Sequence, residues 1–596
     1  MPFRKLLMLV LMGWVACFSA PASCLAQSAA TDAAPAPFAV LYDTGASSAA
    51  PIGDDAMSAR KGWTAVPEDN LTHAFTGDAV FMNDHVAIAL RLKSAGAEVY
   101  SRSSGGFTQR AALLPLGADS APAMLSSIRI IENSQAAVMI EAVLTTPARA
   151  TATFRFRLSV GEALLEVRGG QGAGRLRVCD QSKYVVVPDF FADDMVFDPA
   201  AQTELRVGLP AENSVLGLTD DGRAIVACVW PSSRQNADLL LAGEGPARMI
   251  KGYQIDLADT NHMWIAVMEG AGIWHAQRMT DQKAASTGSG QSHSTGPGQA
   301  RSTGSGRADT ELSLDWKPPM PARWHADFVA AGGATISNSF ADAESTENPT
   351  NGSASCRFDA GRALVRLTDP VSPTAPRLVV IYPVDRTRTT PLTSFCLVDI
   401  MRNALGVGPC QYVLDTERLG AADNVTPEPV THWVEKQFEK KPSKRDVDAI
   451  RDQLSKMTQQ VKRTDARIAD YGSFALNVKQ KCANRAKIPD NAAAAARLVA
   501  ITNSMTAPPA PAAPTVEKLA AEVAAQAEKP DALAKSQPAI TAIRSAGAAQ
   551  DYALAKLRMA SRRLKQECRT LALSDPKSSE FAGEIQQQAE QMLVKK

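Results

Sequence analysis

Hydrophobic and polar residues alternate along much of the first half of the chain in the manner of β-strands. Thr151–Ser159 carries apolar side chains at every second position, and His85–Lys93 and Ala163–Arg168 follow a similar pattern. Turn-forming sequences such as the one at Asp220–Gly222 separate such segments, with no helical periodicity between them. Many strands at short spacing predict an antiparallel β-sandwich over residues 37–282.

Beyond this region the pattern is interrupted and then resumes. Residues 283–308 are rich in Ser, Thr and Gly, which predicts a flexible linker or a long loop. Residues 309–425 contain further strand-like segments and are interpreted as a β-rich continuation. Within them, Thr393–Leu405 has the pattern of one short helix that ends at Gly406, and a strand is expected near Gln411–Leu414.

From about residue 443 the apolar period lengthens from two to three or four. Ser443, with Asp446 three residues later, has the sequence of a capping box. A narrow apolar stripe follows from Val447 to Tyr471, so residues 443–485 are predicted to form one long amphipathic helix.

A second apolar stripe, from Ala553 to Leu571, predicts C-terminal helices over residues 547–596. Residues 486–546 between the two stripes are rich in Ala and Pro, and the prolines at Ala507–Pro514 must interrupt any helix, so only short helices are expected there. The fold class is therefore mainly β, with a C-terminal helical hairpin or three-helix bundle. The narrow apolar stripe of the long helix must pack against another surface, either within the chain or on another protein.

The beginning of the chain has the features of a secretory signal peptide over residues 1–26. Arg4 and Lys5 precede an apolar run, and small residues suit cleavage before Gln27, which would leave a disordered lead over residues 27–36. The protein is therefore expected to be exported, either to a periplasm or as a secreted protein.

Anchoring as a lipoprotein at Cys24 is the alternative for the same segment. Pro21 stands where such signals carry an aliphatic residue, which disfavours this alternative. No later segment approaches 18 consecutive apolar residues, so no transmembrane segment is expected in the mature chain.

Composition narrows the classes of partner. The 596 residues are 45% hydrophobic, with a net charge of +1 at pH 7. Nucleic acid is therefore excluded as the main partner, because phosphate binding needs a surplus of Lys and Arg. The mature chain would keep seven cysteines, an odd number without CxxC spacing, which argues against a zinc cluster of paired cysteines.

Tryptophan and histidine gather on both sides of the Ser/Thr/Gly segment. His262 is near Trp264, Trp274 is followed by His275, and Trp324 by His325. Because an exposed indole can stack on a sugar ring and an imidazole can move a proton, Trp264, Trp274 and Trp324 are candidate ligand-binding residues, and His325 is a candidate catalytic residue. The competing interpretation is that these tryptophans belong to a sandwich core.

The end of a predicted strand near residue 382 supplies a second group. Arg386 and Arg388 could bind a carboxylate or sulfate through paired hydrogen bonds, and Tyr382 or Asp385 could then act as acid or base. The alternative is a polar turn whose arginines pair with local acids.

The stretch Asp189–Asp198 contains four carboxylates, and oxygen-rich loops of this kind can hold calcium. It lacks the regular spacing of an EF-hand loop, so no cofactor is expected and calcium is a weak alternative. Motifs of serine hydrolases, zinc proteases and nucleotide-binding loops are absent from the sequence.

Two cysteines in the helical region suggest a disulfide. If residues 491–529 form a returning middle helix, the first and last long helices run parallel, and Cys482 and Cys568 lie at the same end of the bundle. A disulfide between them would clamp a three-helix arrangement.

These features favour an exported multi-domain protein whose β body binds a glycan or another component of the cell envelope, while its helices contact a protein partner. A lyase or hydrolase acting on an acidic polysaccharide is the enzymatic alternative. A structural or assembly protein of the envelope is the third.

Overall fold

The structure is a computed structural model. It describes residues 38–92, 94–103, 105–118, 123–190, 194–257, 260–278, 310–314, 316–329, 335–341, 348–349, 354–359, 362–367, 378–387, 396–418, 425–440, 442–505 and 510–594. The predicted signal peptide and the segment 283–308 lie outside these residues.

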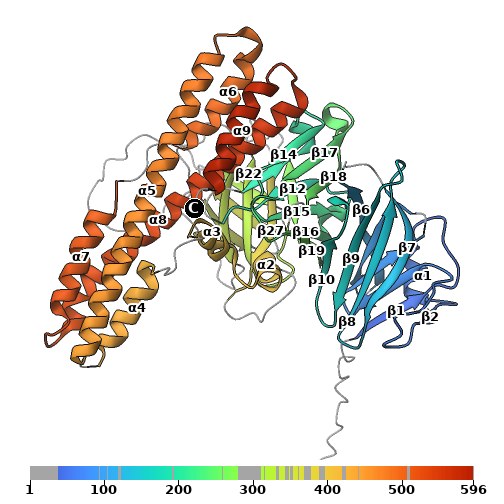
Figure 1. The fold of residues 1–596 in the computed structure, drawn as a ribbon, viewed down its shortest axis with the longest axis horizontal. Helices are drawn as coiled ribbons and strands as arrows, with labels where there is room; N and C mark the ends of the chain where they lie inside the picture. Colours follow the sequence, from blue (N-terminus) through green and yellow to red (C-terminus); the bar gives the residue numbers. More distant parts are fainter. Residues whose placement is uncertain are drawn as a thin grey trace, which may run out of the picture. The chain divides into compact units, whose positions relative to one another are not determined.

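Two large antiparallel sheets form the body of the protein (Figure 1). Sheet A consists, in spatial order, of β14 (Arg206–Leu209), β17 (Ala237–Ala242), β18 (Met249–Asp256), β11 (Ala173–Cys179), β6 (Gly106–Gly117), β5 (Ala97–Ser103), β4 (Val86–Leu90), β3 (Ala79–Asn83), β1 (Ala39–Asp43) and β2 (Thr64–Ala65). Sheet B consists of β13 (Met195–Phe197), β12 (Tyr184–Val187), β15 (Ser214–Thr219), β16 (Ala224–Val229), β19 (His262–Glu269), β10 (Leu164–Gly169), β9 (Thr151–Ser159), β8 (Ala137–Thr145) and β7 (Met124–Asn133). The short helix α1 (Asp54–Ala59) and the 3-10 turns η1 (Pro199–Ala201), η2 (Asp220–Gly222) and η3 (Gly245–Ala247) lie in the connections.

The core between sheets A and B is built by the alternation that the sequence shows. In β9, Phe154 and Phe156 face this core and are fully buried, whereas Thr151 and Arg155 point outward and are exposed. Each buried phenylalanine contributes about 2–3 kcal/mol through the apolar surface it removes from water. The predicted fold class is confirmed for this part of the chain.

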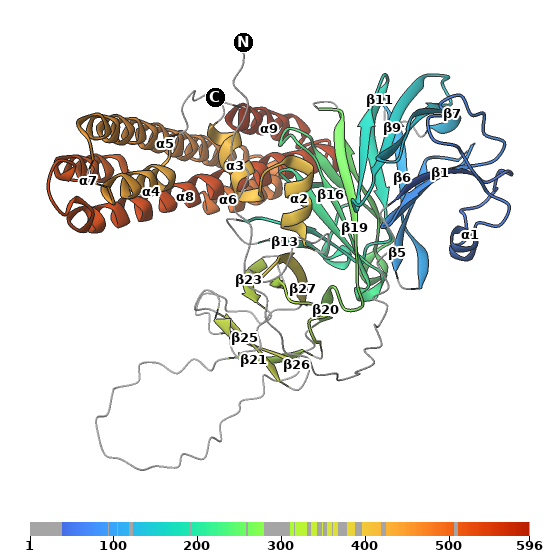
Figure 2. The ribbon, with the colours of Figure 1, turned by 90° about the horizontal axis from the view of Figure 1, so that it is seen from below.

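Sheet C covers part of the outer face of sheet B. It consists of β20 (His275–Arg278), β27 (Leu378–Asp385), β22 (Arg323–Val329) and β23 (Thr335–Ala341). Ile225 of sheet B, Val380 of sheet C and Ile400 of α2 (Leu397–Leu405) belong to one buried apolar cluster. A further sheet, D, consists of β21 (Thr310–Leu314), β26 (Arg362–Leu367), β25 (Ala354–Asp359) and β24 (Asn348–Pro349), of which three strands are labelled in Figure 2.

The strand expected near Gln411–Leu414 is wrong, because these residues lie in helix α3 (Pro409–Arg418). A short apolar run does not distinguish strand from helix, and Pro409 suits the first turn of a helix because proline has no N–H to leave unbonded there. Helix α4 (Pro427–Phe438) follows. The described residues of 396–440 thus contain three helices and no strand.

Two long helices organise the C-terminal region: α5 (Lys444–Arg485) and α8 (Ala532–Ser574), with α6 (Pro489–Ser504), α7 (Ala513–Gln526) and α9 (Ser579–Val594) packed on them (Figure 1). The expected capping box is present, since the Ser443 and Asp446 side chains bond each other's backbone N–H groups. Leu454 of α5 shares a cluster with Ile540 of α8, nearer the beginning of both helices.

Nearer the other end of the bundle, residues from the second halves of α5 and α8 share another cluster, so the two long helices run parallel. Cys482 and Cys568 both lie in that cluster, as the bundle interpretation requires. Both are free thiols, so the predicted disulfide is not formed in this structure. A buried thiol packs as a small apolar side chain, which accounts for their place in the core without a bond.

Helix α8 also packs against the sandwich. The backbone N–H of Gly208 in β14 donates to Thr570 Oγ1 of α8 at 2.7 Å. A Cβ at Gly208 would lie 2.7 Å from the backbone oxygen of Gln566, so the helix approaches the strand at a distance that only glycine permits. None of the helices in the described ranges combines the length and apolar character needed to cross a membrane.

Candidate functional site

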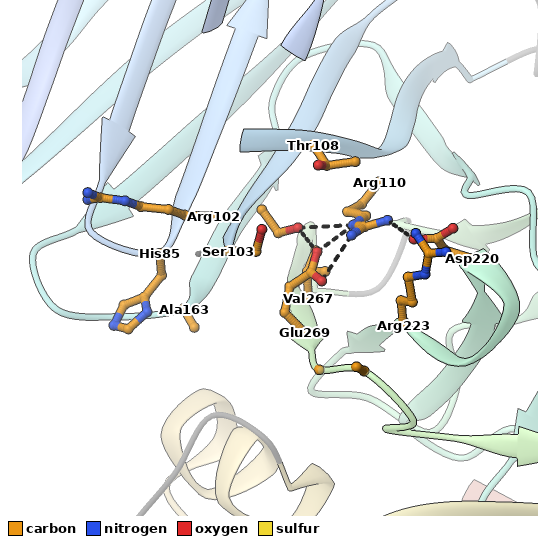
Figure 3. A pocket seen from close by; sticks show the side chains of 13 residues that line it. His85, Arg102, Ser103, Thr108, Arg110, Ala163, Asp220, Arg223, Val267 and Glu269 are labelled. Atoms are coloured by element: carbon orange, nitrogen blue, oxygen red, sulfur yellow. Dashed lines mark hydrogen bonds and ion pairs between the residues drawn. The ribbon is translucent and has the colours of Figure 1, made fainter. Parts of the chain in front are cut away.

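A pocket of about 620 Å³ lies where β5 and β6 of sheet A meet the end of β19 in sheet B (Figure 3). We call it the Arg110 pocket. Its lining is mostly polar: His85, Ser101, Arg102, Ser103, Thr108, Arg110, Asp220, Arg223 and Glu269, with Ala163, Val267, Gly270 and Ala271. Its volume is within the range of sites that bind small molecules.

Arg110 is fixed at the centre of this pocket by two carboxylates (Figure 3). Its Nη1 donates to Asp220 Oδ2 at 2.6 Å and its Nη2 to Glu269 Oε2 at 2.9 Å, and the Arg110 Nε and the Ser101 hydroxyl both donate to Glu269 Oε1. Burial alone would lower the pKa of Arg110, but the hydrogen bonds and charges of Glu269 and Asp220 outweigh it and raise the pKa. The group is therefore a fixed cation.

Two further arginines stand at the margin of the pocket and are exposed. The Arg102 guanidinium lies 6.0 Å from the centre of the Phe107 ring, and Arg223 follows the η2 turn that carries Asp220. His85 lines another part of the pocket and is within 3.0 Å of the neighbouring Asp84 carboxylate. Arg102 and Arg223 can therefore reach a ligand while Arg110 stays fixed.

None of the predicted site residues lines the Arg110 pocket, and sequence reasoning missed its residues. The sequence contains one indication of this pocket, which is the position of Glu269 in the alternating pattern of β19. Met263, Ile265 and Val267 face the sandwich core at alternate positions of β19, and Glu269 continues that series. A carboxylate at a core-facing position at the end of a strand needs a buried partner, and Arg110 is that partner.

The structure brings two predicted catalytic residues, Tyr382 and His325, into one cluster with Asp194 and Asp327. His325 Nδ1 lies 2.7 Å from Asp194 Oδ2, and the Tyr382 hydroxyl lies 2.9 Å from Asp327 Oδ2 and in contact with Asp194 Oδ2. Asp194, Asp327 and Tyr382 are fully buried, and His325 nearly so. This tetrad lies in the layer between sheets B and C, and not in an open cleft.

Burial dominates the electrostatics of the tetrad. It raises the pKa of Asp327 to about 8, with the charge of Asp194 adding to the effect. It also raises the pKa of Tyr382 well above the usual range, again with help from both carboxylates. For His325, burial would lower the pKa, but the charge and hydrogen bond of Asp194 outweigh it and raise the pKa.

Arg386 and Asp385, the other described residues of the predicted strand-end site, have different partners. Arg386 Nε is 3.4 Å from an oxygen of the buried Asp399, so it pairs with a local acid, as the alternative interpretation held. Asp385 accepts a hydrogen bond from the backbone N–H of Arg386 at 2.9 Å. Arg388 lies outside the described residues.

The assignment of Trp274 and Trp324 to a ligand site is wrong, because both are core residues. Trp274 is 3% exposed and donates to the Thr219 backbone oxygen at 2.8 Å, and Trp324 is fully buried against Trp316. An indole in these positions fills the space between packed layers and cannot present a face to a sugar.

Trp264 is half-buried, and its ring centre is 4.1 Å from that of His262. Because Met263 and Ile265 face the sandwich core, Trp264 lies on the outer face of sheet B. His262 in turn is 2.6 Å from Glu166. Trp264 therefore remains a candidate for ligand contact, at a place separate from the Arg110 pocket.

Two described carboxylates of the acidic stretch, those of Asp194 and Asp198, take part in different contacts. Asp194 joins the tetrad, whereas Asp198 caps η1 and binds Arg278 through two bonds of 2.8 and 2.9 Å. Asp193 lies outside the described residues.

No known protein family and no curated protein matches this chain. A solved structure with some similarity is a mutant of a glycoside hydrolase family 81 enzyme from Clostridium thermocellum. The two are 10% identical, the match covers 66% of this chain and 45% of that one, and the TM-score is 0.18. This chain thus spans less than half of that protein, and at this score the similarity carries no argument about function.

Proposed function

We propose that the protein is exported and binds a glycan in the Arg110 pocket. The observation that carries the proposal is the chemistry of the lining, in which guanidinium groups, carboxylates and hydroxyls alternate around one cavity. A sugar hydroxyl both donates and accepts a hydrogen bond, so it can bridge an acid and an arginine at the same time.

Charge supports a glycan over a small anion or an apolar ligand. The pocket is lined by three arginines, Arg102, Arg110 and Arg223, and two carboxylates, Asp220 and Glu269. These ionised groups together carry a net charge of about +1. Such a balance suits a hydroxyl-rich ligand with at most one carboxylate. An apolar ligand would leave many polar groups without hydrogen bonds.

A binding function is better supported than the lyase or hydrolase alternative. The catalytic residues of that alternative, Tyr382 and His325, lie in a layer where Tyr382 is fully buried and His325 is nearly so. A polysaccharide must reach its general acid and base within about 3 Å, and these side chains do not border the Arg110 pocket.

The test is calorimetric titration of the full mature chain with three oligosaccharide probes: a neutral glucan, a uronate-containing oligomer and an amino-sugar oligomer. Arg102→Ala and Arg223→Ala each remove an exposed side chain that lines the pocket, and Arg102→Ala also removes the contact with the Phe107 ring. Each is expected to weaken binding of the recognised probe by roughly tenfold, because a hydrogen bond to a charged group contributes about 1.5–3 kcal/mol.

Arg129→Ala is the matched control, since Arg129 is 65% exposed on β7 and lines no part of the pocket. It should leave affinity unchanged. Failure of all three probes to bind, or equal weakening by Arg129→Ala, would contradict the proposal.

A further inference from the structure

The tetrad of Asp194, His325, Asp327 and Tyr382 converges from three separate segments. Asp194 directly precedes β13, His325 and Asp327 lie on β22, and Tyr382 lies on β27. One ligand atom from each of Asp194, His325 and Asp327 lies within 4.8 Å of the others. Tyr382 contacts both carboxylates.

The surrounding fold holds these groups in position. His325 and Asp327 are two residues apart on one strand and so point to the same face, toward sheet B. Tyr382 pairs with His325 across β22 and β27. The backbone N–H of Asp189 donates to Asp194 Oδ1 at 2.6 Å, which leaves Oδ2 directed at the tetrad. Such outer contacts are what orient metal ligands in proteins.

When Asp194 and Asp327 are both ionised, as a bound cation would keep them, the tetrad has more acceptors than donors. The single hydroxyl hydrogen of Tyr382 is shared by two carboxylates. Among the described residues, Asp327 Oδ1 accepts no well-formed hydrogen bond. The Ser337 hydroxyl lies close enough to this carboxyl to lower its pKa. Asp327 is fully buried, so bulk solvent does not reach this oxygen. A cation at the centre would satisfy these lone pairs.

The ligand types indicate which cation. Calcium and magnesium prefer six or more oxygen ligands, whereas an imidazole with two carboxylates suits zinc or manganese. Two carboxylates balance a charge of +2. Zinc bonds of about 2.0–2.2 Å place tetrahedral ligand atoms roughly 3.5 Å apart, which small side-chain rotations reach from the present geometry.

We infer that Asp194, His325 and Asp327 bind one divalent transition-metal ion, with the Tyr382 oxygen as the fourth neighbour. This site is independent of the Arg110 pocket, and neither proposal requires the other. By tying β13 to sheet C, the ion would hold sheet C on the sandwich.

The experiment uses the full chain, treated with chelator and then dialysed against zinc or manganese chloride. Metal content by mass spectrometry is expected to be one equivalent per chain, and cobalt substitution should give visible absorption bands. Asp194→Asn, Asp327→Asn and His325→Gln should each weaken metal binding at least tenfold and remove the cobalt bands.

Asp198→Asn is the matched control, because it changes the same residue type in the same stretch but outside the tetrad. It should keep full metal content. Circular dichroism identifies any variant that does not fold, and His325→Gln, at the least buried position of the tetrad, is the variant expected to remain folded. The absence of bound metal in the wild type, or equal binding by folded variants, would show that the tetrad is only a buried hydrogen-bond network.

Discussion

Arg558 of α8 and Glu212, which precedes β15, form a buried ion pair across 346 residues of sequence. Arg558 Nε lies 2.8 Å and 3.1 Å from the two carboxylate oxygens, and its Nη2 donates to Ser233 Oγ at 2.7 Å. Arg558 is fully buried and Glu212 is 6% exposed. This pair connects the helical region to the sandwich.

Glu212→Gln is therefore expected to destabilise the protein by about 3–5 kcal/mol, because it leaves the Arg558 charge buried without its counter-charge. Denaturant titration followed by circular dichroism measures the free energy of unfolding. Glu528→Gln serves as the control: its pair with Arg451 is largely exposed, so the change should cost less than about 1 kcal/mol. Equal effects from the two substitutions would contradict this account.

Lys565 on the same helix is 4% exposed, and burial lowers its pKa to about 8, with the nearby charge of Arg562 adding to the effect. Between pH 8 and about 10.5 the unfolded chain holds a proton that the folded chain lacks, so this group makes the protein more stable as pH rises. Below pH 8 the lysine is charged in the folded protein, so the full free-energy cost of burying this charge lowers the stability.

Lys565→Met should accordingly raise the free energy of unfolding at pH 7 by on the order of 1–3 kcal/mol. The gain should shrink as the pH rises from 8 to 10 and disappear only above about pH 10.5, where the lysine is neutral in the unfolded chain as well. Urea titrations of wild type and variant at pH 7 and pH 10 measure the difference. A gain that is independent of pH would mean that packing, not charge, explains it.

Gly217 in β15 lies so close to a buried carboxylate that there is no room for a side chain at this position. A Cβ there would lie 1.9 Å from Asp180 Oδ2, which accepts a hydrogen bond from the Tyr253 hydroxyl at 2.9 Å. Gly217→Ala is expected to cost about 2–4 kcal/mol, because it must displace a buried, hydrogen-bonded group.

The control for Gly217→Ala is Gly53→Ala, where nothing lies within 4 Å of the added Cβ. Thermal unfolding of the two variants should differ by several degrees. A loss at Gly53 as large as that at Gly217 would contradict the steric explanation.

Sequence patterns predicted the fold class because alternation and helical stripes are local properties. The stripe from Val447 to Tyr471 became part of α5, and the alternation in β9 became one face of the sandwich core. Neither pattern shows which segments pack together. The contact between Asp194 and His325, which are 131 residues apart in sequence, therefore cannot be predicted from such patterns. The sequence places Asp194 in a possible calcium-binding stretch and His325 among the catalytic candidates.

The tryptophans show that residue type alone does not predict whether a side chain is exposed at a binding site or buried in a core. Trp264 and Trp274 look equivalent in sequence, yet one lies on the outer face of sheet B and the other lies beneath sheet C. The difference arises because sheet C covers only part of sheet B, and the strands that form it come from distant segments. Burial of an aromatic residue is therefore decided by tertiary packing that no local pattern records.

The helical bundle carries one cysteine on each of its two long helices, α5 and α8. Cys482 and Cys568 are buried in one apolar cluster, and Cys482 is near enough to contribute to the raised pKa of Cys568. The parallel course of α5 and α8 places both cysteines at the same end of the bundle. Under oxidising conditions we therefore expect a Cys482–Cys568 disulfide, which would stabilise the bundle by roughly 4 kcal/mol on the chain-entropy model.

Non-reducing peptide mapping of protein recovered from its own compartment measures this bond directly. Cys228, fully buried in the sandwich core, should remain a thiol, while the exposed Cys410 should be alkylated first in the native protein. Burial also raises the pKa of the Cys482 thiol to about 11, so in reduced protein this cysteine should react with alkylating agents only after unfolding. Recovery of Cys482 and Cys568 as alkylated peptides from the oxidised protein would rule the disulfide out and leave two thiols packed as apolar side chains.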